Sequence, residues 1–339
     1  MRYFGTIEQS TYASVKSSYL FAGLTATMFL VAGTFPAPIL NPNPASQAAP
    51  PPSDAPQLQV ALWLTIFNRG VSISGPDLTS KQIQVFEDGR QQSNVGLIRE
   101  NTGPLAVGLL MQASRERRNT LPHAEIEPAT TFFHLLPDGS VGFAETFSDH
   151  IEIVSRPTTD PAEMERNLRK SANFDLKGCS ALFDAIVSAT ENFTPYPERP
   201  RALLVISDGH DNCSKKTAED ALEAAQRVQA RIYFINLALV DLTDSAPGHN
   251  RGRPARIFRL EQLAKQLAEP TGGTAVDLLG PEGFASLFDQ IRMQLEIRFR
   301  LRYNSSNPIH DGKFRSVRID VGRNYAEILA PSGYYAPKD

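Results

Sequence analysis

Residues 203–212 read LLVISDGHDN and predict a buried strand that ends in a polar loop. The apolar residues at the start do not alternate with polar ones, which is typical of a parallel strand covered on both faces. Asp208 and Gly209 follow the strand directly, and this pair of residues favours a turn. Because ligands of open α/β sheets bind at the carboxyl ends of the strands, the loop that starts at Asp208 is a candidate site.

Two further polar loops stand next to predicted elements. LAVGLLM at residues 105–111 is a second apolar strand, and Gln112-Ala113-Ser114-Arg115-Glu116 follows it. Lys177-Gly178-Cys179-Ser180 precedes a helix that starts at Ala181. We therefore expect all three loops to meet at one edge of a sheet, where the carboxyl ends of its parallel strands lie.

Strands and helices alternate through the middle of the chain. Further strands are predicted at 141–147, 151–154, 202–206, 231–239 and 273–278, and helices at 125–136, 161–171, 181–193, 218–230, 256–267 and 283–298. Alternation with helices of this length predicts an α/β fold: a doubly wound, mostly parallel, Rossmann-like sheet with helices on both faces. This domain spans residues 103–296.

The two flanks of this domain are rich in β-structure. Strands are predicted at 58–66 and 82–87 before it, and at 299–304, 314–321 and 326–330 after it. Neither flank has enough strands to be stable alone. Since the ends of a compact domain often lie close together, we expect residues 57–102 to pair with residues 297–339 in a small β-sandwich.

The N-terminal region has the composition of an export signal. Arg2 and Lys16 precede the apolar run Tyr19–Phe35, which contains no charged residue. Residues 1–35 are therefore interpreted as a signal peptide or an N-terminal membrane anchor. The Pro- and Ala-rich residues 36–56 are interpreted as an extended linker. Both interpretations predict an exported protein that is periplasmic, extracellular or membrane-anchored and facing outward.

Charge and cysteine content exclude several classes of protein. The net charge is −3 over 339 residues, and no basic stripe is present to neutralise phosphates, which argues against a nucleic-acid partner. Contact with a membrane is expected only through the N-terminal anchor. The 2 cysteines are too few for a disulfide scaffold and lack the spacing of zinc ligands.

Five stretches of the sequence resemble von Willebrand factor A (VWA) domains, in particular the bacterial VWFA-related branch of that family. They are LLVISDGHDN at 203–212, GCSALFDAI at 178–186, VFEDGRQQ at 85–92, DGKFRSVRIDV at 311–321 and SGYYAP at 332–337. Each motif is loose alone, but their order and spacing together are specific. The resemblance covers Leu58 to Pro337.

The resemblance implies a metal-ion-dependent adhesion site made by the three loops. In the family, an Asp-x-Ser-x-Ser motif, a later threonine and an Asp-Gly pair supply oxygen ligands to a divalent cation. The corresponding residues of this chain are Gln112, Ser114, Glu116, Ser180 and Asp208. Mg²⁺ or another divalent cation is the cofactor that the resemblance implies. Ser180 is equally suited to cap the helix that starts at Ala181.

Two of these residues depart from the pattern of the family. Gln112 stands in the place of the first aspartate and offers an amide oxygen without charge. Glu116 stands in the place of the second serine and can restore the charge only from a different position. Since Mg²⁺ takes oxygen ligands that usually include carboxylates, two interpretations stay open: a partial metal site and a metal-free loop surface.

The cysteines lie beside two of the three loops. Cys179 adjoins Ser180, and Cys213 follows Asp208 by five residues. If the loops converge, the two thiols come close together, and the compartment of an exported protein allows them to pair. A Cys179–Cys213 disulfide is one expectation and two free thiols the other. A Cα separation above about 7 Å excludes the bond.

Three functions compete on this evidence. The resemblance implies a protein-binding module, for adhesion or assembly, that is not an enzyme and whose protein ligand is recognised at a partial adhesion site. The first alternative is a metal-free structural scaffold with a decayed site, for which Gln112 is the evidence. The second is a hydrolase on a doubly wound sheet, which requires Ser114, His210 and Asp208 to act together. The sequence has no Gly-x-Ser-x-Gly nucleophile motif to support it.

Overall fold

The computed structural model describes residues 58–67, 78–100, 103–113, 123–171, 178–237, 253–321 and 327–338. The predicted signal or anchor (residues 1–35) and linker (residues 36–56) lie outside these ranges, as do Ser114 and Glu116. Among the described helices, none is both long and apolar enough to cross a membrane.

A six-stranded sheet forms the centre of the α/β domain. Its strands lie in the order β10 (Ala275–Asp277), β9 (Ala230–Asn236), β8 (Arg201–Ser207), β5 (Ala106–Gln112), β6 (Val141–Phe147) and β7 (Ile151–Thr158). Neighbouring strands are parallel except at the edge, where β7 runs antiparallel to β6. The predicted doubly wound, mostly parallel sheet is therefore confirmed.

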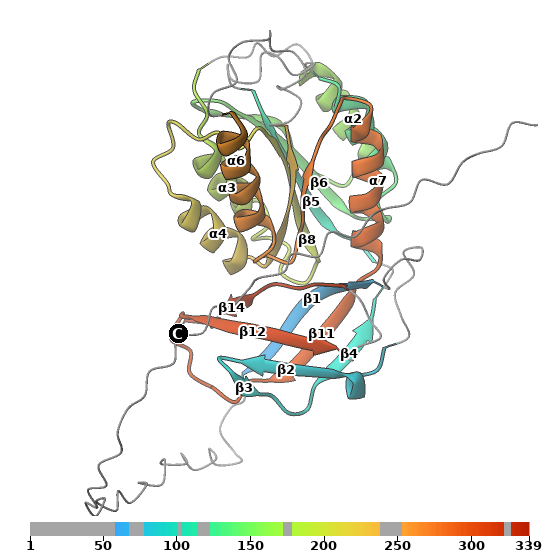
Figure 1. The fold of residues 1–339 in the computed structure, drawn as a ribbon. Coiled ribbons are helices and arrows are strands. Elements are labelled where there is room, and N and C mark those ends of the chain that lie inside the picture. Colours follow the sequence, from blue (N-terminus) through green and yellow to red (C-terminus); the bar gives the residue numbers. More distant parts are fainter. Residues whose placement is uncertain are drawn as a thin grey trace, which may run out of the picture. The chain divides into compact units, whose positions relative to one another are not determined.

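Helices cover both faces of this sheet (Figure 1). One face carries α3 (Leu182–Glu191), α4 (Ala218–Arg227) and α6 (Arg253–Ala268), and the other carries α1 (Ile126–His134), α2 (Pro161–Ser171) and α7 (Gly283–Glu296). Alternate residues of β5 explain the two layers, because Leu109 packs in the core under α1 and α7 while Leu110 packs in the core under α3 and α4. Every residue of β5 is buried, as its unbroken apolar sequence predicts.

Gly108 on β5 is needed for close packing of the sheet. A Cβ atom at this position would lie 2.2 Å from Cζ of Phe143 and 2.9 Å from Cδ1 of Leu203. We expect Gly108→Ala to lower the free energy of unfolding by roughly 1–3 kcal/mol, because the added methyl group overpacks the core. Urea-induced unfolding measures the change. Gly96→Ala is the matched control, since its Cβ meets nothing closer than 3.8 Å and its stability should not fall.

The two flanks together form a pair of four-stranded sheets. One has the order β13 (Glu327–Leu329), β1 (Gln59–Phe67), β11 (Phe299–Asn304) and β4 (Gly96–Arg99). The other has the order β14 (Gly333–Tyr335), β12 (Phe314–Val321), β2 (Ile83–Glu87) and β3 (Arg90–Gln91), with a 3₁₀ turn at Ser80–Gln82 before β2. Side chains of both sheets share one apolar core. Each sheet combines strands from the N-terminal and C-terminal flanks, which is the predicted sandwich.

Some element boundaries differ from the prediction. The edge strand β7 extends to Thr158, and α6 begins at Arg253. The short strands β3, β4 and β14 were not predicted, because two to four residues are too few to show a periodicity.

A carboxylate lies inside the core of the sandwich. Glu87, the last residue of β2, is 3% exposed. Its Oε2 accepts hydrogen bonds from the hydroxyls of Tyr303 (2.8 Å) and Tyr334 (3.0 Å), and its Oε1 accepts one from the hydroxyl of Ser305. Burial, followed by the charge of Glu87, raises the pKa of both tyrosines far above the ordinary value, so they stay protonated as donors. Because these residues come from both sheets, this cluster ties the sheets together.

Candidate functional site

Gln112 is at the carboxyl end of β5, and its side chain is fully buried. Its Oε1 accepts one hydrogen bond from the hydroxyl of Ser207 at 2.9 Å and another from the backbone N–H of Asp208 at 2.8 Å. The amide oxygen therefore joins the ends of the neighbouring strands β5 and β8. Both of its lone pairs are used within the protein.

Asp208 follows β8 and is 2% exposed. Its Oδ1 accepts a hydrogen bond from the backbone N–H of His210 at 2.8 Å, and its Oδ2 lies 3.2 Å from Nδ1 of the His210 ring. Burial acts to raise the pKa of Asp208, but the contacts with His210 outweigh it and hold the pKa below the ordinary value. At neutral pH the group is therefore a buried carboxylate with an imidazole against one side.

Ser180 is fully buried and precedes α3. Its backbone N–H donates to Oδ1 of Asn212 at 2.7 Å, and its carbonyl accepts from the N–H of Asn212 at 2.9 Å. Among the described residues, its hydroxyl finds no hydrogen-bond partner. The interpretation of Ser180 as a helix cap is wrong, because Ala181 takes that position and no side chain of the N-cap residue closes the helix.

The loop after β8 supplies the polar groups at the start of α3 instead. Oδ2 of Asp211 accepts from the N–H of Phe183 at 3.0 Å, and the hydroxyl of Ser214 accepts from the N–H of Asp184 at 3.1 Å. The carboxylate of Asp184 in turn accepts from the N–H groups of Lys215 and Lys216. These reciprocal contacts hold the two loops in one arrangement.

A disulfide joins the same two loops. Cys179 and Cys213 are bonded, and their Cα atoms are 6.1 Å apart. That distance lies within the range that a disulfide requires. Two of the three predicted loops are therefore linked both covalently and by hydrogen bonds. The part of the third loop that contains Ser114 and Glu116 lies outside the described residues.

Sequence reasoning missed two contributors to this edge of the sheet. Ser207 donates to Gln112, and its hydroxyl accepts from the N–H of Gly209 at 3.0 Å. The turn between β6 and β7 also reaches the site, because the carbonyl of Ser148 accepts from the N–H of Ala181 at 2.8 Å. The position of Ser207, between an apolar strand and Asp208, could have marked it as a residue of the loop edge. No local signal shows that this turn meets Ala181, because the two are distant in sequence.

The described loop residues do not form a ligand set that suits Mg²⁺. Among the described residues at the implied metal-binding positions, Asp208 is the one carboxylate, and its Oδ2 and the hydroxyl of Ser180 are both buried without a hydrogen-bond partner. The oxygen of Gln112 already accepts two hydrogen bonds, and the His210 ring lies against the carboxylate of Asp208. Mg²⁺ demands near-octahedral oxygen ligation. Nowhere in the described ranges do three His, Cys, Asp or Glu side chains stand in an arrangement that could hold a metal.

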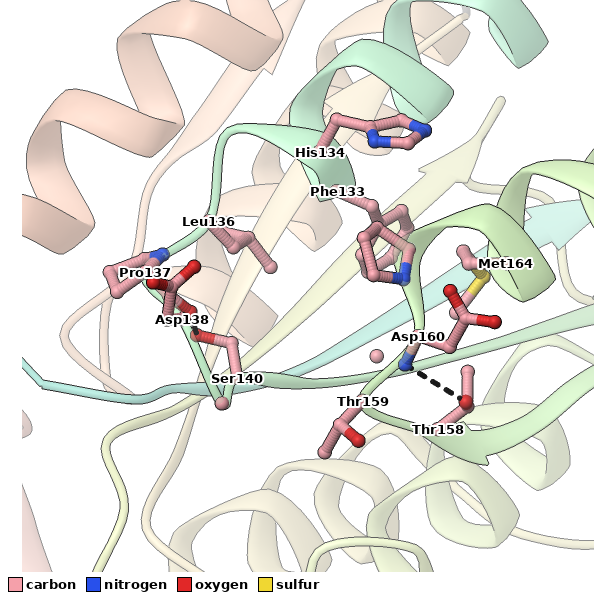
Figure 2. Close-up of a pocket in the computed structure, with 13 residues that line it drawn as sticks. Phe133, His134, Leu136, Pro137, Asp138, Ser140, Thr158, Thr159, Asp160 and Met164 are labelled. Carbon is pink, nitrogen blue, oxygen red and sulfur yellow. Dashed lines mark hydrogen bonds between the residues drawn. The ribbon is translucent and has the colours of Figure 1, made fainter.

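A separate cavity lies at the opposite edge of the sheet, where β6 begins (Figure 2). It is lined by residues of the end of α1, of the α1–β6 connection and of the segment that leads into α2, including Phe133, Ser140 and Asp160. Its volume of about 90 Å³ is well below the several hundred Å³ of ordinary ligand pockets. Asp160 caps α2 through the N–H of Ala162, so its carboxylate has a structural role.

No protein-family model and no curated protein matches the sequence. Among solved structures, the chain is similar to the conserved hypothetical protein BatB from Bacteroides thetaiotaomicron, with 16% identity, a TM-score of 0.43, and coverage of 56% of this chain and 98% of that one. It is also similar to a von Willebrand factor type A protein from Catenulispora acidiphila, with 11% identity and a TM-score of 0.46. The match covers 84% of this chain and 75% of that one.

A third similar structure is proximal thread matrix protein 1 from the mussel byssus, which is described with a zinc-occupied adhesion-site motif. The identity is 12% and the TM-score is 0.46, and the match covers 62% of this chain and 50% of that one. Identities and TM-scores this low say nothing about what this chain does. The strand order, the antiparallel edge strand and the helices on both faces define its architecture. The chain has a doubly wound, mostly parallel α/β fold with one antiparallel edge strand. In this α/β domain the loops that carry Gln112, Ser180 and Asp208 lie at the carboxyl ends of the strands.

Proposed function

We propose that the chain is an exported VWA-type protein-binding module, for adhesion or assembly, which docks its partner at the loop edge without an adhesion-site cation. The occupied oxygen of Gln112 carries this proposal. An amide oxygen that accepts two protein hydrogen bonds has no lone pair left for a metal. The position where the resemblance requires a metal-binding aspartate therefore serves as an internal brace.

Exposed apolar side chains near the loops support a protein partner. Phe258, in the first turns of α6, is 60% exposed, and Leu279, which follows β10, is 74% exposed. Leu260 of the same helix packs against Gly209 in the loop after β8. Apolar patches rimmed by polar groups are typical of surfaces that bind proteins, and we infer that Phe258 and Leu279 belong to such a patch.

A binding role fits these residues better than catalysis. Acyl transfer requires a nucleophile within hydrogen-bond reach of a base. Both cysteines are in the disulfide, and no residue in the described ranges accepts a hydrogen bond from the hydroxyl of Ser180 as a base would. The ring of His210 contacts the carboxylate of Asp208. We therefore favour a module without enzymatic activity.

Thermal unfolding of the natural protein and of a Gln112 variant tests whether the loop edge binds a cation. We expect the thermal midpoint of the natural protein to be the same in millimolar Mg²⁺, in Mn²⁺ and in chelator. Gln112→Asp removes the amide acceptor and adds a carboxylate beside Asp208, so its free energy of unfolding should fall by roughly 2 kcal/mol. Its midpoint should then rise with Mg²⁺, because a cation that binds only the folded state stabilises it.

Gln112→Asn is the control for this substitution, since it shortens the side chain equally without adding charge. It should lose stability and gain no response to Mg²⁺. A midpoint of the natural protein that rises with Mg²⁺ and falls with chelator contradicts the metal-free proposal.

Site-specific photo-crosslinking in the native host tests the docking edge. A photoreactive residue at Phe258 or Leu279 should trap one defined protein in intact cells, on the outer side of the cytoplasmic membrane. The same residue at Ile309, which is 59% exposed and belongs to the sandwich flank, is the control. Equal trapping from all three positions, or none from any, contradicts docking at the loop edge and favours a scaffold role.

A further inference from the structure

Two arginine side chains are buried where β1 of the sandwich meets β9 of the α/β domain. Arg231 on β9 is 5% exposed, and Arg298, which precedes β11, is 2% exposed. Nη1 of Arg231 donates to the hydroxyl of Thr65 on β1 at 2.8 Å, and that hydroxyl donates to the carbonyl of Gln294 at 3.0 Å. Nη2 of Arg231 is buried and has no hydrogen-bond partner in the part of the chain that the structure describes.

Neither guanidinium is paired with a carboxylate. Arg298 donates from Nη1 to the carbonyl of Leu295 and from Nη2 to the carbonyl of Gly103, both at 2.9 Å, and these acceptors carry no charge. Within the described part of the chain, no ion pair includes Arg231 or Arg298. The two cations also repel each other: burial, followed by the charge of Arg231, lowers the pKa of Arg298.

Arg231 lines a small hollow at this junction. Trp63, Gln226, Thr271 and Pro331 are among its other lining residues. The volume of about 10 Å³ is about what a single particle the size of a water molecule needs. Polyatomic anions such as sulfate and phosphate are too large for it. The side-chain amide of Gln226 already donates to the carbonyl of Pro270 and the hydroxyl of Ser332, both at 3.3 Å.

A buried and unpaired charge is costly, and arginine cannot remove the cost by losing its proton. A water molecule that accepts from the free N–H of Arg231 brings no negative charge, and the carboxylates of Glu100 and Glu296 favour the charge of Arg298 without outweighing its burial and the repulsion by Arg231. A small monovalent anion accepts the same hydrogen bond and also offsets the repulsion between the two guanidiniums. We propose that a monatomic halide, of which chloride is the physiological member, binds at Arg231 and stabilises the junction between the sandwich and the α/β domain.

Titration of the full-length protein with chloride tests this site. The thermal midpoint is measured while sodium gluconate is exchanged for sodium chloride at constant ionic strength. We expect it to rise by roughly 2–4 °C for each tenfold increase in chloride above the dissociation constant, because the anion binds only the folded state. Bromide should act in the same way and should appear beside Arg231 in anomalous scattering from bromide-soaked crystals.

Two variants separate the site from a general effect of salt. Arg231→Met removes the guanidinium and should abolish the difference between chloride and gluconate. Arg199→Met removes an exposed guanidinium that donates to the carbonyl of Gly139 and should keep the difference. Equal midpoints of the natural protein in chloride and gluconate overturn the proposal, even if Arg231→Met does not fold. A chloride response that survives in Arg231→Met overturns it as well.

Discussion

Replacing both Cys179 and Cys213 with serine is expected to lower the free energy of unfolding by about 4 kcal/mol. The cysteines are 34 residues apart in sequence, so their bond closes a long loop in the unfolded chain. Opening that loop raises the entropy of the unfolded state, and the loss of stability follows from its length. Equilibrium unfolding in urea of the double variant and the natural protein measures the difference.

The folded arrangement of the two loops should survive this substitution. Ser180 and Asn212 remain joined by backbone and side-chain hydrogen bonds, and Asp211 still accepts from the N–H of Phe183. The natural protein treated with a dithiol reductant is the matched comparison and should lose a similar amount of stability. A double variant as stable as the oxidised natural protein would show that the disulfide does not contribute.

Glu87→Ala is expected to lower the free energy of unfolding by roughly 3–5 kcal/mol. The substitution leaves the buried hydroxyls of Tyr303, Tyr334 and Ser305 without the acceptor that they share. It also leaves a void between the two sheets of the sandwich. The effect therefore combines lost hydrogen bonds with lost packing, and chemical unfolding followed by tyrosine fluorescence measures it.

Glu87→Gln is the matched control, because it keeps the shape and one acceptor oxygen. We expect it to cost less than half as much as alanine. In the triple variant Glu87→Ala, Tyr303→Phe, Tyr334→Phe, the stranded tyrosine hydroxyls are gone, so part of the loss should be recovered. Equal stability of the alanine variant and the natural protein is incompatible with a cluster that ties the sheets together.

The amino-acid sequence was sufficient to predict the α/β core. Unbroken apolar runs such as residues 105–111 and 203–206 predict strands covered on both faces, and the structure places β5 and β8 there, side by side. The pairing of the flanks also followed from sequence, since neither flank has enough strands to be stable alone. The spacing of apolar residues along the sequence shows which side chains are buried, and the buried faces determine how the sheet and helices pack in layers.

Only the tertiary structure determined what the polar side chains of the loop edge do. Gln112 and Ser207 are 95 residues apart in sequence, and no local pattern reveals that the amide oxygen of one accepts from the hydroxyl of the other. Ser180 was equally suited to cap a helix or to bind a ligand, and the structure shows that its hydroxyl does not cap α3. Hydrogen bonds depend on angles and distances between residues that meet only in the folded chain.

The same reason applies to the sandwich junction and, in part, to the polar loop edge of the α/β domain. Arg231 stands at the start of an ordinary apolar strand, and its contact with Thr65 in place of a carboxylate of the described residues became visible only once β1 and β9 were placed. The sequence motifs located the loops that carry Gln112, Ser180 and Asp208, because each motif is a contiguous stretch of the chain and the motifs follow one another in a specific order. The use of the Gln112 oxygen as an internal brace is a property of the fold, because its partners come from a neighbouring strand.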